Sequence, residues 1–198
     1  YLIPDNQELE YTLSNDDIEY EYTNSDSVVY LLDSNDYVAR TFIPGGKGEI
    51  QEQAKYLLNS LVIDGPRNNS IPNGFRQLIP AGTEIKDLSL ENNVLTINFS
   101  KELLDINEKY EEKMLESIVY TLTNIEGIDS VVIKVEGEIL KELPNSKKQL
   151  PTSLDRSYGI NKYYDISSVN NVDSYTVYYV SSYNNNEYYV PVTKYINN

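Results

Sequence analysis

The sequence predicts an α+β fold in which two helices pack on one face of a mixed, mainly antiparallel sheet, with an extra C-terminal β-hairpin. Over residues 28–143, the patterns follow one another as strand, strand, helix, strand, strand, helix, strand. Both predicted helices are apolar on one face only, and hairpin-linked strands favour antiparallel pairing. A two-layer packing then buries every apolar face. The second observation is a hairpin pattern that occurs twice in the chain.

The first hairpin pattern consists of residues 28–32 and 37–41, and the second of residues 176–180 and 189–193. In each, two runs rich in β-branched and aromatic residues flank a polar turn, which is typical of a β-hairpin. An isolated hairpin is marginally stable in water. The second hairpin must therefore bury its apolar face on the first domain or on a neighbouring chain. We expect the first domain, with the two hairpins forming a pseudo-symmetric pair.

The first predicted helix covers residues 49–63. Its apolar residues recur at helical spacing on one face, at Ile50, Ala54, Leu57, Leu58 and Leu61. The helix should end at residues 64–66, because Gly65 suits a left-handed C-cap and Pro66 cannot continue a helix.

Extended segments are predicted after this helix. Residues 75–79 form a short run, and residues 84–90 and 94–99 should pair through a polar turn. Apolar and polar residues alternate from Leu95 to Phe99, as in a half-buried strand.

The longest helix is predicted to begin after Ser100, a candidate N-cap, and to end at Gly127. Its apolar stripe recurs every three or four positions, at Tyr110, Met114, Ile118, Leu122 and Ile125, widened by Leu115 and Val119. Thr121 is expected on the less apolar side. Residues 131–135 form the last predicted strand of this domain.

These patterns divide the chain into four parts. Residues 1–27 carry eight acidic residues and no Lys or Arg, which predicts a disordered acidic tether with room for one short strand on a neighbour. Residues 28–143 form a complete domain. Residues 144–174 are rich in Ser and Asn and predict an irregular connector. Residues 175–198 form the first hairpin of a second, incomplete domain.

Composition excludes several classes of function. The formal charge of −15 argues against binding to nucleic acid or to an anionic membrane surface. The chain has no Cys and no His, which excludes disulfides and the usual nucleophilic triads. No apolar run is long enough to span a bilayer, and no signal peptide is present. We expect no cofactor.

Two groups of acidic residues are candidates for a metal site or for a catalytic site. Residues 33–36 (Asp-Ser-Asn-Asp) resemble the start of a calcium loop, but the later ligands and the glycine of an EF-hand are missing, so we predict a hairpin turn and no metal. Glu108, Glu111 and Glu112 are expected on a solvated helix face. An enzyme would need a cleft with two carboxylates of separated pKa. We therefore predict no catalytic residue.

Several motifs resemble, in order, those of the GerMN domain family of sporulation and germination lipoproteins. The resemblance is carried by Leu61 to Pro66 (LVIDGP), 72–75 (PNGF), 79–83 (IPAGT), 94–100 (VLTINFS), 118–123 (IVYTLT) and 131–137 (VVIKVEG). It covers about residues 28–143, and the C-terminal hairpin matches the start of a second copy. The fold implied is similar to the ring-building modules of secretion-type rings.

The resemblance implies a secreted, lipid-anchored protein with two such modules. The anchoring Cys and the later part of a second module are absent from these 198 residues. It further implies a non-enzymatic role outside the cytoplasmic membrane, in the mother cell–forespore channel complex. Partners would be other envelope or channel proteins, with self-association also open.

Aromatic residues in the second hairpin offer a candidate interface, at Tyr178, Tyr179, Tyr188 and Tyr189. Tyrosine combines apolar area with a polar end, which suits protein contacts. The alternative, slightly favoured, is that these rings pack inside a second domain. A further alternative function is a cell-wall accessory module that binds peptidoglycan by stacking aromatic rings on sugars.

Overall fold

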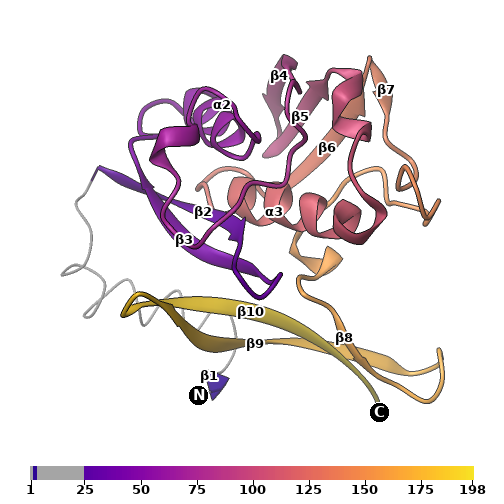
Figure 1. The fold of residues 1–198 in the computed structure, drawn as a ribbon. Coiled ribbons are helices and arrows are strands. Elements are labelled where there is room, and N and C mark those ends of the chain that lie inside the picture. The colour runs from indigo at the N-terminus through magenta and orange to yellow at the C-terminus, as the bar shows by residue number, and fades with distance from the viewer. Residues whose placement is uncertain (1, 4–24) are drawn as a thin grey trace.

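The structure, a computed structural model, describes residues 2–3 and 25–198 (Figure 1). Most of the predicted acidic tether, residues 1–27, lies outside the described residues. At its end, Asp26 and Ser27 belong to strand β2, which therefore begins before the predicted first strand. None of the described helices combines the length and the apolar character that a bilayer-crossing helix needs.

The strands form two mixed sheets. The first sheet has the strand order β1-β9-β10-β3-β2, and β8 pairs with β10 in parallel. Its strands are β1 (Leu2–Ile3), β2 (Asp26–Leu32), β3 (Val38–Pro44), β8 (Tyr163–Asp165), β9 (Val172–Tyr183) and β10 (Asn186–Asn197). The second has the order β4-β5-β6-β7, with strands β4 (Ile85–Glu91), β5 (Val94–Phe99), β6 (Ser130–Val135) and β7 (Glu138–Ile139). Strands β5 and β6 are parallel and the other neighbours in this sheet are antiparallel.

The predicted α+β class and the mainly antiparallel pairing are confirmed, but the strands divide between two sheets instead of one. The chain between helix α2 and β4 joins neither sheet as a strand. Its backbone pairing consists of two isolated bridges, Leu32 with Arg76 and Val62 with Ile79. The predicted strand at residues 75–79 is therefore a connecting segment, and the first hairpin pairs with β10 instead of β4.

Helix α2 (Ile50–Ser60) forms where the helical spacing predicted it and buries Ala54, Leu57 and Leu58. Its end differs in detail from the prediction. The left-handed residue is Asp64, with a φ of 52°, and not Gly65. Gly65 is instead a point of close approach, because a Cβ there would lie 2.9 Å from the carbonyl oxygen of Val62.

Helix α3 (Glu111–Thr123) begins later than predicted. Two short 3-10 turns, Lys101–Leu104 and Glu108–Tyr110, precede it. The Ser100 hydroxyl accepts a hydrogen bond from Glu84 N (2.9 Å) and caps no helix, while the Asn107 side chain accepts from Lys109 N (2.9 Å). Asn107 is thus the N-cap of the second 3-10 turn, which continues directly into α3, so the helical run starts after Asn107 and not after Ser100.

The first residue of α3, Glu111, is buried, which corrects its predicted place on a solvated face. Its carboxylate accepts hydrogen bonds from the backbone N–H groups of Asn145 and Ser146, at 2.8 and 2.9 Å. Burial alone would raise the pKa of Glu111, but the hydrogen bonds from Ser146 and Asn145 outweigh burial and lower it. The carboxylate thus fixes the start of the connector, which also contains β8 and a 3-10 turn at Arg156–Tyr158.

Two hydroxyl groups of α3 form hydrogen bonds with backbone groups at the outer edge of β2. Tyr30 N donates to Thr121 Oγ1 (3.0 Å), and Ser117 Oγ donates to the carbonyl oxygen of Tyr30 (2.5 Å). All three residues are buried. An uncovered edge strand can pair with other chains through its free backbone groups. These two bonds occupy the N–H and C=O groups of Tyr30 at this edge. The expectation that Thr121 lies on the less apolar side of its helix was therefore wrong.

Replacing Thr121 with valine should lower the free energy of unfolding by about 1–3 kcal/mol, because the shape is kept while the buried Tyr30 N–H loses its acceptor. Urea unfolding followed by circular dichroism measures the change. The same substitution at the half-buried Thr96 of β5 is the matched control and should be nearly neutral. Equal effects at the two positions would contradict the role given to Thr121.

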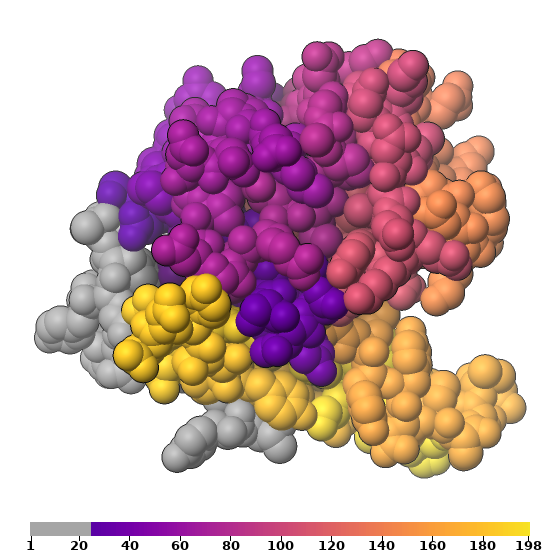
Figure 2. Space-filling model, in the orientation of Figure 1, coloured from indigo at the N-terminus to yellow at the C-terminus, as the bar shows by residue number. Residues whose placement is uncertain are grey.

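The C-terminal hairpin lies against the first one. Strand β10 pairs with β3 at Tyr189 and Arg40, so the second strands of the two hairpins are antiparallel neighbours, as a pseudo-symmetric pair requires. Side chains add to this pairing, since the rings of Phe75 and Tyr188 meet edge to face at 4.9 Å. In the space-filling view, the β2–β3 turn (indigo) lies next to the C-terminal hairpin (yellow) (Figure 2).

Candidate binding groove

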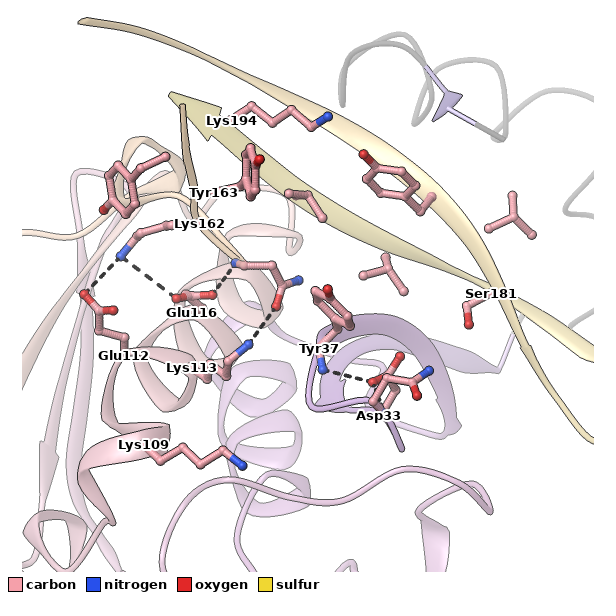
Figure 3. A pocket seen from close by; sticks show the side chains of 17 residues that line it. Asp33, Tyr37, Lys109, Glu112, Lys113, Glu116, Lys162, Tyr163, Ser181 and Lys194 are labelled. Carbon is pink, nitrogen blue, oxygen red and sulfur yellow. Dashed lines mark hydrogen bonds and ion pairs between the residues drawn. The ribbon is translucent and has the colours of Figure 1, made fainter. Parts of the chain in front are cut away.

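A cavity of about 760 Å³ lies between α3 and the C-terminal hairpin, and is called here the α3–hairpin groove (Figure 3). Four parts of the chain line it: residues 33–37 of the β2–β3 turn, residues 109–116 before and in α3, residues 161–164, and one face of β9 and β10. The groove is therefore made jointly by the first domain and the hairpin.

Asn161 joins the two sides of the groove. Its amide Nδ2 donates to the carbonyl oxygens of Val38 and Pro191, each at 2.7 Å, and its Oδ1 accepts from Val38 N at 2.8 Å. The residue is buried and has a φ of 46°, a left-handed conformation that asparagine tolerates better than most residues. One side chain thus bonds to the backbones of β3 and β10 at once.

Asp33 organises the β2–β3 turn. Its Oδ1 accepts from the backbone N–H groups of Asn35 and Tyr37, both at 2.9 Å, and its Oδ2 accepts from the buried Tyr188 hydroxyl at 2.9 Å. The predicted hairpin turn is confirmed, and both carboxylate oxygens are engaged by protein donors. Within residues 2–3 and 25–198, no cluster of three or more His, Cys, Asp or Glu side chains could hold a metal ion.

Positive charge gathers around Asp36 at one end of the groove. Its carboxylate pairs with Arg76 and with Lys109, and Lys113 Nζ donates to its backbone carbonyl oxygen at 2.7 Å. The hydrogen bond from Lys109, helped by Arg76, lowers the pKa of the Asp36 carboxyl. Two cations thus share one carboxylate and a third bonds to the adjacent carbonyl oxygen, so three positive charges surround one negative charge at this end.

A buried ion pair lies deeper in the groove. The side chains of Glu116 and Lys162 are 3% and 9% exposed, and their charged atoms are 3.9 Å apart. Glu116 Oε1 also accepts from Asn161 N at 2.6 Å. Burial raises the pKa of Glu116 to about 7 despite the opposing effect of Lys162, and burial lowers the pKa of Lys162 despite Glu116 and Glu112.

Stability should therefore fall as pH rises from about 4.5 to 7, by an amount on the order of 3 kcal/mol from Glu116. The folded chain holds the Glu116 proton more tightly than the unfolded chain does. Loss of that proton as the pH rises therefore favours the unfolded chain. Glu116→Gln keeps an acceptor for Asn161 N and should remove most of this dependence of the free energy of unfolding on pH, called here the pH slope. Denaturant unfolding across this pH range provides the measurement.

Glu112, Lys113 and Lys162 also face Glu116, so the control is Glu112→Gln, which alters a carboxylate that is 36% exposed. This control should leave most of the pH slope in place. The lowered pKa values of Asp36 and Glu111 act in the opposite direction, and only in more acidic solution. A pH slope that survives Glu116→Gln would show that another group causes it.

The four tyrosines predicted as an interface do not share one environment. Tyr178 and Tyr188 are buried within the chain, which corrects their assignment to an intermolecular surface. Tyr179 and Tyr189 are half-buried, and of these Tyr179 lines the groove.

The exposed tyrosines of the groove were missed by sequence reasoning. Tyr163 and Tyr164 are 57% and 59% exposed, and Tyr37 is exposed on the β2–β3 turn. Tyr164 also stacks on Tyr195 at a ring distance of 4.7 Å. The available signal was the sequence Lys162-Tyr163-Tyr164, a basic and aromatic run inside a connector otherwise rich in Ser and Asn.

Known proteins resemble this chain in sequence and in fold. The family model Germane, described as sporulation and spore germination, matches residues 28–141. The spore germination protein GerM of Bacillus subtilis (strain 168) is 36% identical over 173 residues, covering 86% of this chain and 46% of the relative. This chain thus spans about half the length of that curated relative.

Two solved structures have the same fold. The tandem GerMN domains of the sporulation protein GerM from Bacillus subtilis match with a TM-score of 0.80 at 34% identity, over 87% of this chain and 61% of that chain. The first GerMN domain alone matches with a TM-score of 0.62 at 32% identity, over 67% of this chain and 98% of that chain. With more than half of its residues matched by the family model, this protein belongs to the Germane family of sporulation and spore germination proteins.

Proposed function

We propose that this protein acts in sporulation as a GerM-like, non-enzymatic assembly protein outside the cytoplasmic membrane. It contributes through protein–protein contacts to the channel complex between mother cell and forespore. Family membership and the 36% identity to a spore germination protein support the link to sporulation. Attachment to the membrane through a lipid anchor is part of the proposal, and a cysteine for it would have to come from outside these 198 residues.

The observation that carries the assembly role is the α3–hairpin groove itself. It combines exposed tyrosines, Tyr37, Tyr163 and Tyr164, with an apolar floor that includes Val190 and Val192. Aromatic residues around a partly apolar depression are typical of protein interfaces, where a few such anchors supply most of the binding energy. A groove of this size can receive several side chains of a partner.

Peptidoglycan binding is the second candidate function. The exposed rings of Tyr163 and Tyr164 are the observation in its favour, because flat aromatic surfaces can stack on sugar rings. Lys113 and Lys194 favour a protein partner with carboxylates instead, since a neutral sugar would supply no counter-charge to these two lysines, which form no ion pair within the described residues.

Three carboxylates line the groove, Asp33, Glu112 and Glu116, and glycoside hydrolysis would require two. Both oxygens of Asp33 are engaged by protein donors, which leaves Glu112 and Glu116 as the candidate pair. The position of Glu116 argues against that chemistry. Its side chain is 3% exposed, one oxygen accepts from Asn161 N and the other faces Lys162. A structural ion pair accounts for these contacts, so we retain a non-enzymatic role.

An affinity pull-down from membrane extracts of sporulating cells, read by mass spectrometry, tests the proposed function. The tagged chain should recover components of the forespore channel. Recovery of wall hydrolases or glycan fragments instead would favour the peptidoglycan-binding alternative. Recovery of neither class would overturn the assembly role.

A further inference from the structure

Four of the chain's 16 basic residues line the α3–hairpin groove, although the chain as a whole has a charge of −15. They are Lys109, Lys113, Lys162 and Lys194. Three carboxylates, those of Asp33, Glu112 and Glu116, line the groove as well, so its lining carries a formal charge of +1. Charges farther away than about 8 Å are largely screened at physiological ionic strength, so a ligand in the groove meets a local charge opposite in sign to the overall charge.

Lys194 lines the groove from β10. Its ammonium lies 5.9 and 5.7 Å from the ring centroids of Tyr163 and Tyr179. Among the residues that the structure describes, no carboxylate approaches it within 4 Å. Two aromatic rings thus flank a cation that forms no ion pair with the described part of the chain.

The other cations lie across the groove, on the side of α3 (Figure 3). Lys109 and Arg76 share the carboxylate of Asp36, and Lys113 donates to the carbonyl oxygen of Asp36 and to Asn161 Oδ1. Between this end and Lys194 lies the apolar floor that includes Val190 and Val192. Cationic ends and an apolar middle match a ligand with separated carboxylates and an apolar group between them.

We propose that the α3–hairpin groove docks an acidic, extended peptide segment of a partner protein. One carboxylate of the peptide pairs with Lys194, another pairs with the cations around Asp36, and an apolar side chain lies on the floor between them. This inference rests on the proposed assembly function and names the chemistry of the partner. A glycan without carboxylates would leave Lys194 without a counter-charge. A nucleic acid carries a negative charge at every phosphate and would place some of them against Glu112 and Glu116, whereas a peptide with separated carboxylates can place its charges at the two cationic ends.

The test uses the full chain and a fluorescein-labelled peptide of alternating glutamate and leucine, with binding measured by fluorescence anisotropy. The matched peptide has glutamine at each glutamate. The glutamate peptide should bind and the glutamine peptide should bind at least tenfold more weakly. Lys194→Gln should weaken binding of the glutamate peptide about tenfold, as expected for one charge-assisted contact. Lys55→Gln removes the same charge from the exposed face of α2 and should change affinity by less than about twofold.

Equal binding of the two peptides, or equal losses for Lys194→Gln and Lys55→Gln, would overturn the proposal. Displacement of the glutamate peptide by neutral glycan fragments but not by an unlabelled glutamate peptide would overturn it as well. Hydrogen exchange of β9 and β10 in Lys194→Gln checks that the hairpin stays in place.

The pull-down separates this inference from the function on which it rests. If wild-type protein and the Lys194→Gln variant capture the channel components equally, the assembly role stands and the groove is not the docking site. If neither captures them, the proposed function fails. Loss of capture by Lys194→Gln alone, together with the peptide result, supports both.

Discussion

Replacing Asn161 with alanine is expected to release the C-terminal hairpin from the first domain while the domain core stays folded. The substitution removes three buried hydrogen bonds and leaves Val38 N, Val38 O and the carbonyl oxygen of Pro191 without their partner. Each lost hydrogen bond costs about 1–3 kcal/mol. The free energy of docking the hairpin on the first domain should therefore become less favourable by about 3 kcal/mol or more. Amide hydrogen exchange of residues 172–197 should accelerate about 100-fold or more.

Two further variants separate the causes. Asn161→Gly accepts the φ of 46° without strain, so it should release the hairpin only through the lost amide. Asn161→Asp keeps an acceptor for Val38 N but loses both donated bonds, and should have an intermediate effect. Hydrogen exchange that stays at the wild-type rate in Asn161→Gly would show that other contacts, such as the Tyr188–Asp33 hydrogen bond, hold the hairpin.

The local part of the fold could be predicted because it depends on local spacing. The apolar residues of α2 and the alternation in β5 reflect the geometry of a helix and of a strand, and both elements formed where expected. The division into two sheets depends on which strands meet, and the spacing of side chains does not encode that. The start of α3 was misplaced for a different reason, since Ser100 and Asn107 are both residues that favour an N-cap, and it is Asn107 that caps the turn leading into the helix.

The groove was harder to predict because residues distant in sequence build it. Asn161 bonds to Val38, 123 positions away, and Tyr188 bonds to Asp33, 155 positions away. The tyrosines of the second hairpin were recognised as interaction residues, yet folding buries Tyr178 and Tyr188. A count of tyrosines cannot separate the rings that anchor the hairpin from those that stay exposed, because one residue type serves in both places.

The largest loss of stability is expected from Phe99→Ala in β5. Phe99 is fully buried, lies between Ile85 of β4 and Val135 of β6, and belongs to the core cluster that also contains the buried residues of β2, α2 and α3. Truncating a buried Phe removes its apolar area from the core and leaves a cavity, which typically costs 3–5 kcal/mol. That is a large share of the about 5–15 kcal/mol that stabilises a typical domain. Urea unfolding should show a lower midpoint, and Thr96→Ala on the outer face of β5 is the control, with a cost of about 1 kcal/mol or less.

Phe99→Ala and Asn161→Ala should also differ in what they unfold. Because the core cluster joins residues of both sheets, loss of the Phe99 ring should destabilise the first domain as one unit, and the hairpin would lose the surface on which it packs. Hydrogen exchange should then accelerate in β2, β5, α3 and β10 together. Asn161→Ala should accelerate exchange in β9 and β10 and leave β5 unchanged, because the lost side-chain hydrogen bonds join β3 and β10 and none reaches the second sheet. If Phe99→Ala left exchange in β2 and β10 at the wild-type rate, the two sheets would be independently stable, and the groove between α3 and the hairpin would not depend on the domain core.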